Sequence, residues 1–193
     1  TVMPGSMDTV IKKSLEEYSG KKIGLEIGLC YNPEFIALGT VIKDMLNPDI
    51  LLIGESDVEA GNLLEKIYEK VAKTKPKIHR MNFINAEIAK ISVNSFVTTK
   101  ISYANMLAEI CETLPGADVD VVTNAVGDDT RIGRKYLRGG TAFGGPCFPR
   151  DNKAMAALGK TISVNTSLTE VTDSTNDYQA KRLKNIITSR LNP

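Results

Sequence analysis

Cys147 is placed where a thiol could do chemistry, because it follows the glycine-rich run 143–146 and precedes a helical pattern over 151–158. Pro149 suits the first turn of a helix, so we expect Cys147 just before a helix N-terminus. The partial positive charge of that terminus and the permanent charge of Arg150 both favour a thiolate, the reactive form of cysteine. The pattern predicts a nucleophile, although a buried structural thiol fits this segment equally well.

A lysine and an asparagine share one face of a predicted helix. Lys90 and Asn94 are four residues apart, so their side chains project in the same direction. Their neighbours Ile88, Ile91 and Val93 are apolar. A lysine partly removed from water could stabilise an oxyanion while the amide orients it. A solvated lysine is the commoner arrangement, and both interpretations stay open at this point.

A carboxylate follows a predicted strand end and a proline turn in the run Tyr31-Asn32-Pro33-Glu34-Phe35. Loops after strands are where the sites of α/β proteins gather. Glu34 is therefore a candidate functional acid. Taken alone, it is explained at least as well as an acid in the first turn of a helix, where it complements the helix dipole.

The composition bounds the class of protein. The chain has 193 residues, of which 42% are hydrophobic and 24% charged, and its net charge is +1. These values are typical of a chain that buries a core. Basic and aromatic residues are not interleaved, so nucleic acid is not an expected partner. No segment suggests a membrane partner either.

The cysteines and the single histidine argue against two kinds of site. No Cys-x-x-Cys pair occurs, and His79 is the only histidine, so we expect neither a disulfide framework nor a metal site. Cys30 and Cys111 lie in apolar runs and are predicted to pack in the core. Without a signal-peptide pattern, the reducing cytoplasm is the expected compartment.

The first part of the chain alternates helical and strand patterns. Residues 7–18 and 63–71 repeat apolar side chains at helical intervals, whereas 21–29, 49–54 and 77–81 are short apolar runs of strand length. This alternation predicts an α/β domain with a parallel sheet.

The second part is predicted to be helical. From residue 83 to 114 neither glycine nor proline occurs, and Pro115 and Gly116 then end the pattern. At about 1.5 Å per residue, this helix would span about 45 Å. That length suggests a helix shared between the two subunits of a dimer, although on length alone an internal core helix is the commoner explanation. Further helices are predicted over 118–126, from 128 onward, and over 169–191.

Five motifs occur in a fixed order, at residues 32–35, 86–94, 127–133, 143–151 and 176–179. Their order, spacing and residue types resemble the UDP-glucose/GDP-mannose dehydrogenases, a family that oxidises a nucleotide-sugar alcohol to a uronate. The resemblance covers nearly the whole chain. It implies an α/β remnant of a Rossmann-like domain followed by an all-α central domain with one long helix.

The resemblance also implies domain boundaries. Residues 1–82 would be the C-terminal part of the NAD-binding domain, residues 83–175 the helical substrate and dimerisation domain, and residues 176–193 a linker helix into a further domain. The partners it implies are a nucleotide-sugar substrate and a second copy of the chain, bound through residues 83–114.

The activity that the resemblance implies is an NAD-dependent four-electron oxidation at the sugar C6. Cys147 matches the cysteine that forms a thiohemiacetal and then a thioester. Lys90 and Asn94 match the residues that stabilise the developing alkoxide. Asp151 matches an aspartate that works with a water as acid or base, and Glu34 matches the glutamate that activates water for thioester hydrolysis.

Binding roles follow from the same matches. The residues implied in substrate binding are Phe35, Arg131, Tyr136, Arg138, Gly139, Phe143, Gly144 and Gly145. Those implied in cofactor binding are Thr1, Glu34, Cys147 and Arg150.

Two positions depart from the family pattern. Leu38 stands where a second glutamate is common, and Arg150 stands where a lysine is frequent. The loss of a carboxylate at Leu38 supports an alternative, in which the protein is a non-catalytic dimerisation or regulatory relative of the same fold.

No Gly-x-Gly-x-x-Gly fingerprint occurs in the chain, which begins with Thr1 rather than methionine. We therefore expect a fragment that on its own binds NAD poorly and turns over little. The run Cys-Phe-Pro-Arg-Asp with Pro146 before it resembles the UDP-glucose branch of the family, which implies UDP-glucose as the substrate. GDP-mannose and UDP-N-acetylhexosamines stay open.

Overall fold

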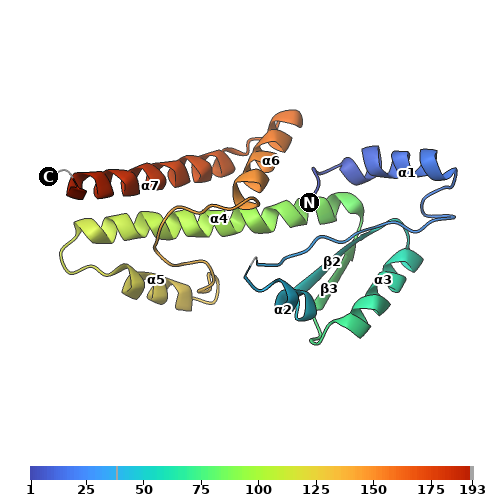
Figure 1. Cartoon of the computed structure of the whole chain (residues 1–193), viewed down its shortest axis with the longest axis horizontal. Coiled ribbons are helices and arrows are strands. Elements are labelled where there is room, and N and C mark those ends of the chain that lie inside the picture. Colours follow the sequence, from blue (N-terminus) through green and yellow to red (C-terminus); the bar gives the residue numbers. More distant parts are fainter. Residues whose placement is uncertain (38, 192–193) are drawn as a thin grey trace. The chain divides into compact units, whose positions relative to one another are not determined.

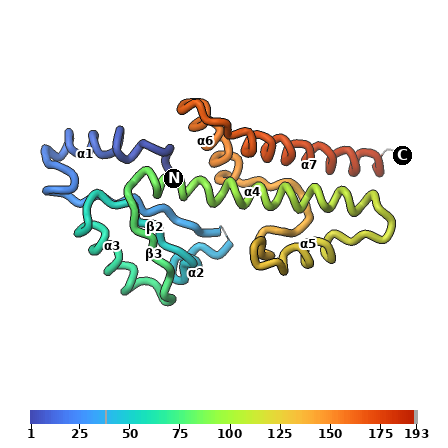
Figure 2. The backbone as a smooth tube through the Cα atoms, turned by 180° about the vertical axis from the view of Figure 1, so that it is seen from behind, coloured from blue at the N-terminus to red at the C-terminus, as the bar shows by residue number. Residues whose placement is uncertain are grey.

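The computed structural model describes residues 1–37 and 39–191. Their contacts divide the chain into two compact units, Thr1–Lys90 and Ile91–Pro193. Figures 1 and 2 show the elements of these units from opposite sides.

A three-stranded sheet forms the centre of the first unit (Figure 1). Its middle strand, β2 (Ile50–Glu55), pairs in parallel with β3 (Lys77–Met81) and antiparallel with β1 (Cys30–Tyr31). The side chains of Leu51, Leu52 and Ile53 are buried. Such a continuous apolar run is typical of a strand that is covered on both faces. The strands predicted at 49–54 and 77–81 are confirmed.

Residues 21–29 form turns, so the strand predicted there is wrong. Gly24 has a left-handed φ of +83°, and a single bridge joins Ile23 to Ile27. Glycines interrupt this run, and glycine weakens a strand interior. Among the residues that the structure describes, only β1 pairs with β2 on this side, and it does so antiparallel, so the expectation of a parallel sheet is wrong at this edge.

The helices of the first unit follow their sequence signals. A π-helical turn, η1 (Met7–Ile11), runs directly into α1 (Lys12–Ser19), and α3 (Val58–Val71) lies between the two parallel strands in the chain. Asp57 caps α3 by accepting a hydrogen bond from the Ala60 N–H at 2.8 Å. The helices predicted over 7–18 and 63–71 are therefore confirmed. The short α2 (Val41–Leu46) has no counterpart among the predicted elements.

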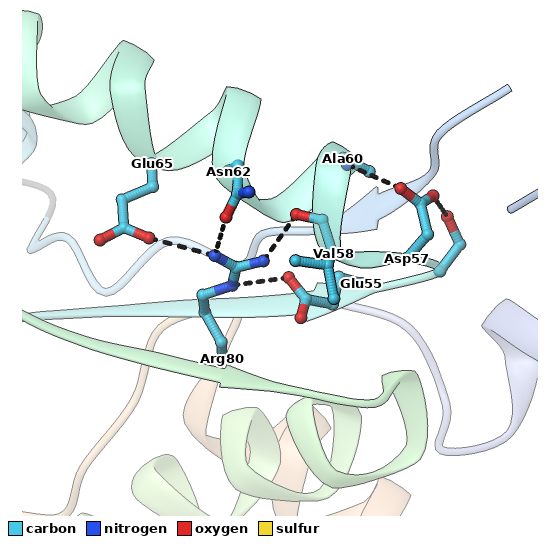
Figure 3. A network of polar contacts seen from close by, with 8 residues as sticks. Glu55, Asp57, Val58, Ala60, Asn62, Glu65 and Arg80 are labelled. Carbon is cyan, nitrogen blue, oxygen red and sulfur yellow. Dashed lines mark hydrogen bonds and ion pairs between the residues drawn. The ribbon is translucent and has the colours of Figure 1, made fainter.

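Arg80 on β3 ties the sheet to α3 (Figure 3). Its Nε donates to Glu55 Oε2 on β2 at 2.8 Å, and its Nη2 donates to the Val58 carbonyl at 2.8 Å. Its Nη1 contacts Asn62 and Glu65 on the same helix. Every nitrogen of the guanidinium group thus has a partner within one strand–helix–strand unit.

The N-terminal segment is held by one buried carboxylate. Glu87, in the first turns of α4 (Phe83–Thr113), accepts hydrogen bonds from Gly5 N at 2.7 Å and Met7 N at 2.8 Å. The Glu87 side chain is fully buried. Gly5 and Met7 lie at the N-terminal end of η1, where backbone N–H groups have no partner within the helix, and the Glu87 carboxylate satisfies them. Glu87 therefore ties the backbone of residues 5 and 7 to the start of α4.

The second unit is helical and contains most of α4 together with α5 (Val119–Asp128), α6 (Phe148–Thr161) and α7 (Ser167–Leu191). In both views α7 runs beside α4 (Figures 1 and 2). Tyr178 and Gln179 on α7 donate to the two carboxylate oxygens of Glu109 on α4, at 2.5 and 3.0 Å.

The helices predicted over 83–114, 118–126 and 169–191 are confirmed, but the helix predicted from 128 onward is wrong. Residues 129–136 form turns. The Asp129 side chain accepts hydrogen bonds from the Arg131 backbone N–H at 3.0 Å and from its guanidinium group. Local bonds of this kind offer the backbone an alternative to a helix.

Candidate active site

Cys147 stands at the N-cap of α6, as its neighbours predict. Its carbonyl oxygen accepts a hydrogen bond from Asp151 N at 2.9 Å, and Pro149 lies in the first turn. The Cys147 side chain is exposed. The alternative of a buried structural thiol is therefore wrong.

Asp151, one turn into α6, is a fully buried carboxylate with a partner on each oxygen. Arg150 Nε donates to Oδ1 at 2.9 Å, and Asn94 Nδ2 donates to Oδ2 at 2.6 Å. The hydrogen bond to Asp151 raises the pKa of Arg150, whose guanidinium group also interacts with the Cys147 thiol. A permanent cation thus links the buried carboxylate to the exposed sulfur.

The next residue holds α6 in place. The Asn152 side chain accepts a hydrogen bond from the Thr98 hydroxyl on α4 at 3.1 Å and donates to Asp173 on α7 at 2.8 Å. Asn152 is 1% exposed. A buried amide with a partner on each side fixes the first turn of α6, and with it Cys147 and Asp151.

Lys90 is buried in the first unit, so the alternative of a solvated lysine is wrong. Its Nζ donates to the Glu34 carbonyl oxygen and lies 4.3 Å from the centre of the Phe35 ring. A lysine that is removed from water and placed over an aromatic face keeps a well-defined position. The structure therefore brings together three residues of the predicted site, Glu34, Phe35 and Lys90.

The Glu34 loop is anchored by a tyrosine that the sequence did not single out. Tyr68 on α3 donates to Asn32 Oδ1 at 2.5 Å and lies 3.3 Å from Glu34 Oε1, while Asn32 donates to the Leu52 carbonyl at 2.8 Å. Burial, followed by the charge of Glu34, raises the pKa of Tyr68. Glu34 is exposed and lies outside any helix, so the explanation as a first-turn acid is wrong.

Three residues predicted to bind substrate, Arg131, Tyr136 and Arg138, have exposed side chains, and the two arginines have local partners. Arg131 pairs with Asp129 at 2.6 Å, and Arg138 lies 3.8 Å from Asp120. Tyr136 adopts a φ of +62°, a conformation that is uncommon for a residue other than glycine. These side chains and those of Cys147 and Asp151 all belong to the second unit.

The glycines of the run 139–145 serve two purposes. A Cβ atom at Gly139 would lie 2.9 Å from the side chains of Ala108 and Val119, so this glycine permits close packing. Gly144 and Gly145 face open space, and Gly145 has a φ of +81°. These two therefore leave room for a ligand beside the chain.

The residues implied in cofactor binding come from both units. Thr1 and Glu34, of the first unit, have exposed side chains. The junction between β2 and α3 carries Glu55, Asp57 and Glu59 at the helix N-terminus, where a diphosphate would need N–H groups and no negative charge. The junction between β2 and α3 therefore does not fit a diphosphate.

Further features bear on the site. In residues 1–37 and 39–191, no group of three or more histidine, cysteine, aspartate or glutamate side chains could hold a metal ion. No helix in the same residues is long and apolar enough to cross a membrane. Leu38, the departure from the family pattern, lies outside the described residues.

Comparison with known proteins identifies both parts of the chain. Residues 1–72 match the NAD binding domain of the UDP-glucose/GDP-mannose dehydrogenase family, and residues 84–178 match its central domain. The UDP-glucose 6-dehydrogenase AglM of Haloferax volcanii is 33% identical over 98% of the chain and 44% of its own length. The GDP-mannose 6-dehydrogenase of Pseudomonas putida is 33% identical over 97% of the chain and 42% of its own length.

Solved structures agree with this assignment and with the expected fold class. A UDP-glucose dehydrogenase from Pyrobaculum islandicum is 31% identical, with a TM-score of 0.90 over 99% of the chain and 43% of its own. The chain spans less than half the length of the curated relatives it matches. Both domains matched, the shared motifs and the common fold lead to one conclusion: the chain belongs to the UDP-glucose/GDP-mannose dehydrogenase family, whose members are NAD-dependent nucleotide-sugar dehydrogenases.

Proposed function

We propose that the full-length gene product oxidises the C6 alcohol of a nucleotide sugar, UDP-glucose in the first place, to the uronate through covalent intermediates on Cys147. The observation that carries this proposal is the exposed Cys147 at the N-cap of α6, beside Arg150 and the buried Asp151. The family's cofactor is NAD, which when bound supplies the hydride acceptor.

Two hydrides leave the same carbon. In the first oxidation the C6 alcohol loses a hydride and a proton and becomes an aldehyde. The Cys147 sulfur then adds to the aldehyde carbon to give a thiohemiacetal. Loss of a second hydride and a proton gives a thioester, and water releases the carboxylate and restores the thiol. Covalent capture keeps the reactive aldehyde from diffusing away between the two oxidations.

We assign the first oxidation to the residues around Asp151. Its carboxylate, held by Arg150 and Asn94, would exchange protons with a water beside the sugar oxygen. Asn94 and Lys90, one turn apart in α4, would stabilise the negative oxygen that develops at C6.

We assign thioester hydrolysis to Glu34. Its carboxylate is exposed, whereas its backbone carbonyl is held by Lys90 and its loop by Tyr68. A carboxylate on an anchored loop can take a proton from water without losing its position. The reaction belongs in the cytoplasm, where the Cys147 thiol stays reduced.

The substrate is the finer part of the proposal. UDP-glucose is favoured by the sequence around Cys147 and by relatives named UDP-glucose 6-dehydrogenases at 33 to 38% identity. GDP-mannose is the second candidate, because GDP-mannose 6-dehydrogenases are 32 to 33% identical over nearly the whole chain.

We also propose that the protein is a homodimer through the long helix 83–114, within a substrate and dimerisation domain of residues 83–175. Exposed apolar side chains recur on α4 at intervals of seven, three and four residues; they are Phe96, Tyr103, Met106 and Ile110. A stripe of this kind is typical of a helix that packs against another helix. A monomeric mass at micromolar concentration would refute the dimer.

The experiment is NADH formation by the full-length gene product with UDP-glucose, counted per sugar consumed. Two NADH per sugar are expected. Cys147→Ser should lower turnover by at least about 1,000-fold, since a hydroxyl at this position lacks the nucleophilicity of a thiolate. Cys111→Ser, at a half-buried cysteine of α4, is the matched control and should retain activity.

Other outcomes separate the alternatives. Activity with GDP-mannose or an N-acetylated UDP-sugar, and none with UDP-glucose, would preserve the chemistry and replace the substrate. No NADH with any nucleotide sugar would contradict the proposed activity and favour the non-catalytic relative.

A further inference from the structure

The run 138–145 follows an irregular path beside the start of α6, without regular strand or helix pairing to fix it. Backbone N–H and C=O groups in such a segment need other partners when they leave water. Two asparagine side chains, Asn105 and Asn176, supply them. Asn105 was not singled out by the sequence, and Asn176 belonged to a family motif without an assigned role.

Asn105 on α4 binds the first half of the run. Its Oδ1 accepts a hydrogen bond from Gly140 N at 2.8 Å, and its Nδ2 donates to the Thr141 carbonyl at 2.9 Å. Its side chain is 2% exposed. The Asn105 amide thus binds the backbone N–H of one residue and the backbone C=O of the next, as the backbone of a neighbouring strand would.

Asn176 on α7 binds the second half in the same way. Its Oδ1 accepts from Phe143 N at 2.7 Å, and its Nδ2 donates to the Phe143 carbonyl at 2.9 Å. The Phe143 ring in turn packs edge-on against Phe148 in the first turn of α6, with ring centres 6.1 Å apart. Residue 143 is therefore fixed by its backbone and by its side chain, four positions before Cys147.

These contacts differ from ordinary side-chain packing because they hold only main-chain atoms. Asparagine is suited to this, since its amide carries both an acceptor and two donors in one plane. The two asparagines bind none of the side chains of the run. Gly144 and Gly145, which follow directly, face open space. The path of the backbone is thus set from α4 and α7, while the surface beside Cys147 stays open.

We infer that Asn105 and Asn176 are positioning residues, which hold the run 139–143 so that its backbone can lie along a nucleotide sugar bound at Cys147. The inference rests on the proposed function for the identity of that ligand. The holding of the run itself rests on the four hydrogen bonds alone.

The first test uses hydrogen exchange in the unmodified chain. The amides of Gly140 and Phe143 should be protected, because each donates to a buried or half-buried amide oxygen. In Asn105→Ala and Asn176→Ala the side chain no longer accepts from the N–H, so the amide that each asparagine binds should exchange faster. Rapid exchange of both amides in the unmodified chain would overturn the inference.

The second test uses the full-length gene product with UDP-glucose. Asn176→Asp should raise KM by about tenfold or more, the expected cost of leaving a carbonyl without its donor beside a new charge. The kcat should fall less than KM rises, since a displaced binding run weakens ground-state and transition-state binding alike. Asn124→Asp is the control, because Asn124 is exposed and its oxygen accepts from Arg134, a role that aspartate also fills.

The outcomes are distinguishable from failure of the proposed function. If the unmodified protein oxidises no nucleotide sugar, the proposed function is wrong. Hydrogen exchange then remains the test of whether the two asparagines hold the run 139–143. If it oxidises UDP-glucose and Asn176→Asp keeps its KM, or loses kcat with KM unchanged, the positioning role is wrong. Asn105→Ser provides a second variant that introduces no charge into the buried site and should show the same rise in KM.

Discussion

Arg80 in the first unit and Arg150 in the second both bind carboxylates, but their hydrogen-bond networks end at different kinds of group. Every guanidinium nitrogen of Arg80 binds a partner on β2 or α3, so its hydrogen-bond network lies entirely within these elements of the fold (Figure 3). Arg150 binds one buried carboxylate, Asp151, and lies beside an exposed thiol. The first arrangement joins elements of the fold, and the second leaves a reactive atom facing outward.

The difference shows how a structural ion network is told from a chemical one. Pairing alone does not decide, because charge pairs near a surface contribute little to stability and occur in either setting. What matters is whether the network ends at a group that a substrate can reach. Arg80 is thus expected to matter for folding, and the Arg150–Asp151 pair for turnover.

The largest effect should come from the carboxylate of the chemical network. Asp151→Asn keeps the shape and can still accept from Arg150, although not from Asn94 as well. It removes the group that exchanges a proton, so kcat of the full-length gene product with UDP-glucose should fall by about 100-fold or more. The fold should persist, as judged by circular dichroism.

The same exchange at Asp118 is the matched control. Asp118 caps α5 by accepting from Asp120 N and Val121 N, and asparagine caps a helix about as well. A kcat for Asp151→Asn within a few-fold of that of the unmodified protein would show that the Arg150–Asp151 network is structural, and that it does not differ in role from the Arg80 network.

The next effect concerns the Arg80 network and appears in stability. Gly61 lies inside α3, where alanine usually stabilises a helix by about 1 kcal/mol. A Cβ atom there would lie 1.6 Å from Glu55 Oε2 and 2.5 Å from Arg80 Nη2. We therefore expect Gly61→Ala to lower the free energy of unfolding by about 1–3 kcal/mol, because the network must shift to admit the methyl group.

Urea unfolding of the chain measures this change. Gly39→Ala, where nothing lies within 4 Å of the added atom, should be close to neutral. A stabilised Gly61→Ala variant would mean that the Arg80 network yields easily and does not fix the packing of α3 on the sheet.

The sequence predicted those parts whose signals are local. The helix over 83–113 follows from an uninterrupted apolar repeat that ends before Pro115 and Gly116, and β2 follows from a short run of buried aliphatic residues. The position of Cys147 before a helix follows from Pro149. Each of these depends on residues within one turn or one strand.

The parts that were missed depend on contacts between distant residues. Tyr68 meets Asn32 across 36 positions, and Asn105 meets Thr141 across 36 positions. In an amphipathic helix a tyrosine or an asparagine gives no sign of the loop it will bind. The strand expected over 21–29 failed for another reason, since Gly24 takes a left-handed φ of +83° and turns the chain.

The smallest expected effect on stability concerns a third arginine network. In it, Arg182 on α7 binds Glu109 on α4 at 3.2 Å. The hydrogen bond from Tyr178, followed by that from Gln179, lowers the pKa of Glu109 below its ordinary value. A carboxyl whose pKa is lowered by folding stabilises the folded state above the pKa of the unfolded chain, about 4.3, and this contribution is lost as the pH falls through the lowered folded pKa.

Glu109→Gln should therefore cost about 1 kcal/mol of unfolding free energy at pH 7, and this difference from the unmodified chain should shrink between about pH 5 and pH 3. Urea unfolding at several pH values measures it. Glu170→Gln, at an exposed glutamate paired with Lys160, is the control and should change stability little at pH 7. A difference that stays constant or grows in acid would show that Glu109 acts through packing, and that the α4–α7 contact, unlike the Arg80 network, does not depend on its charge.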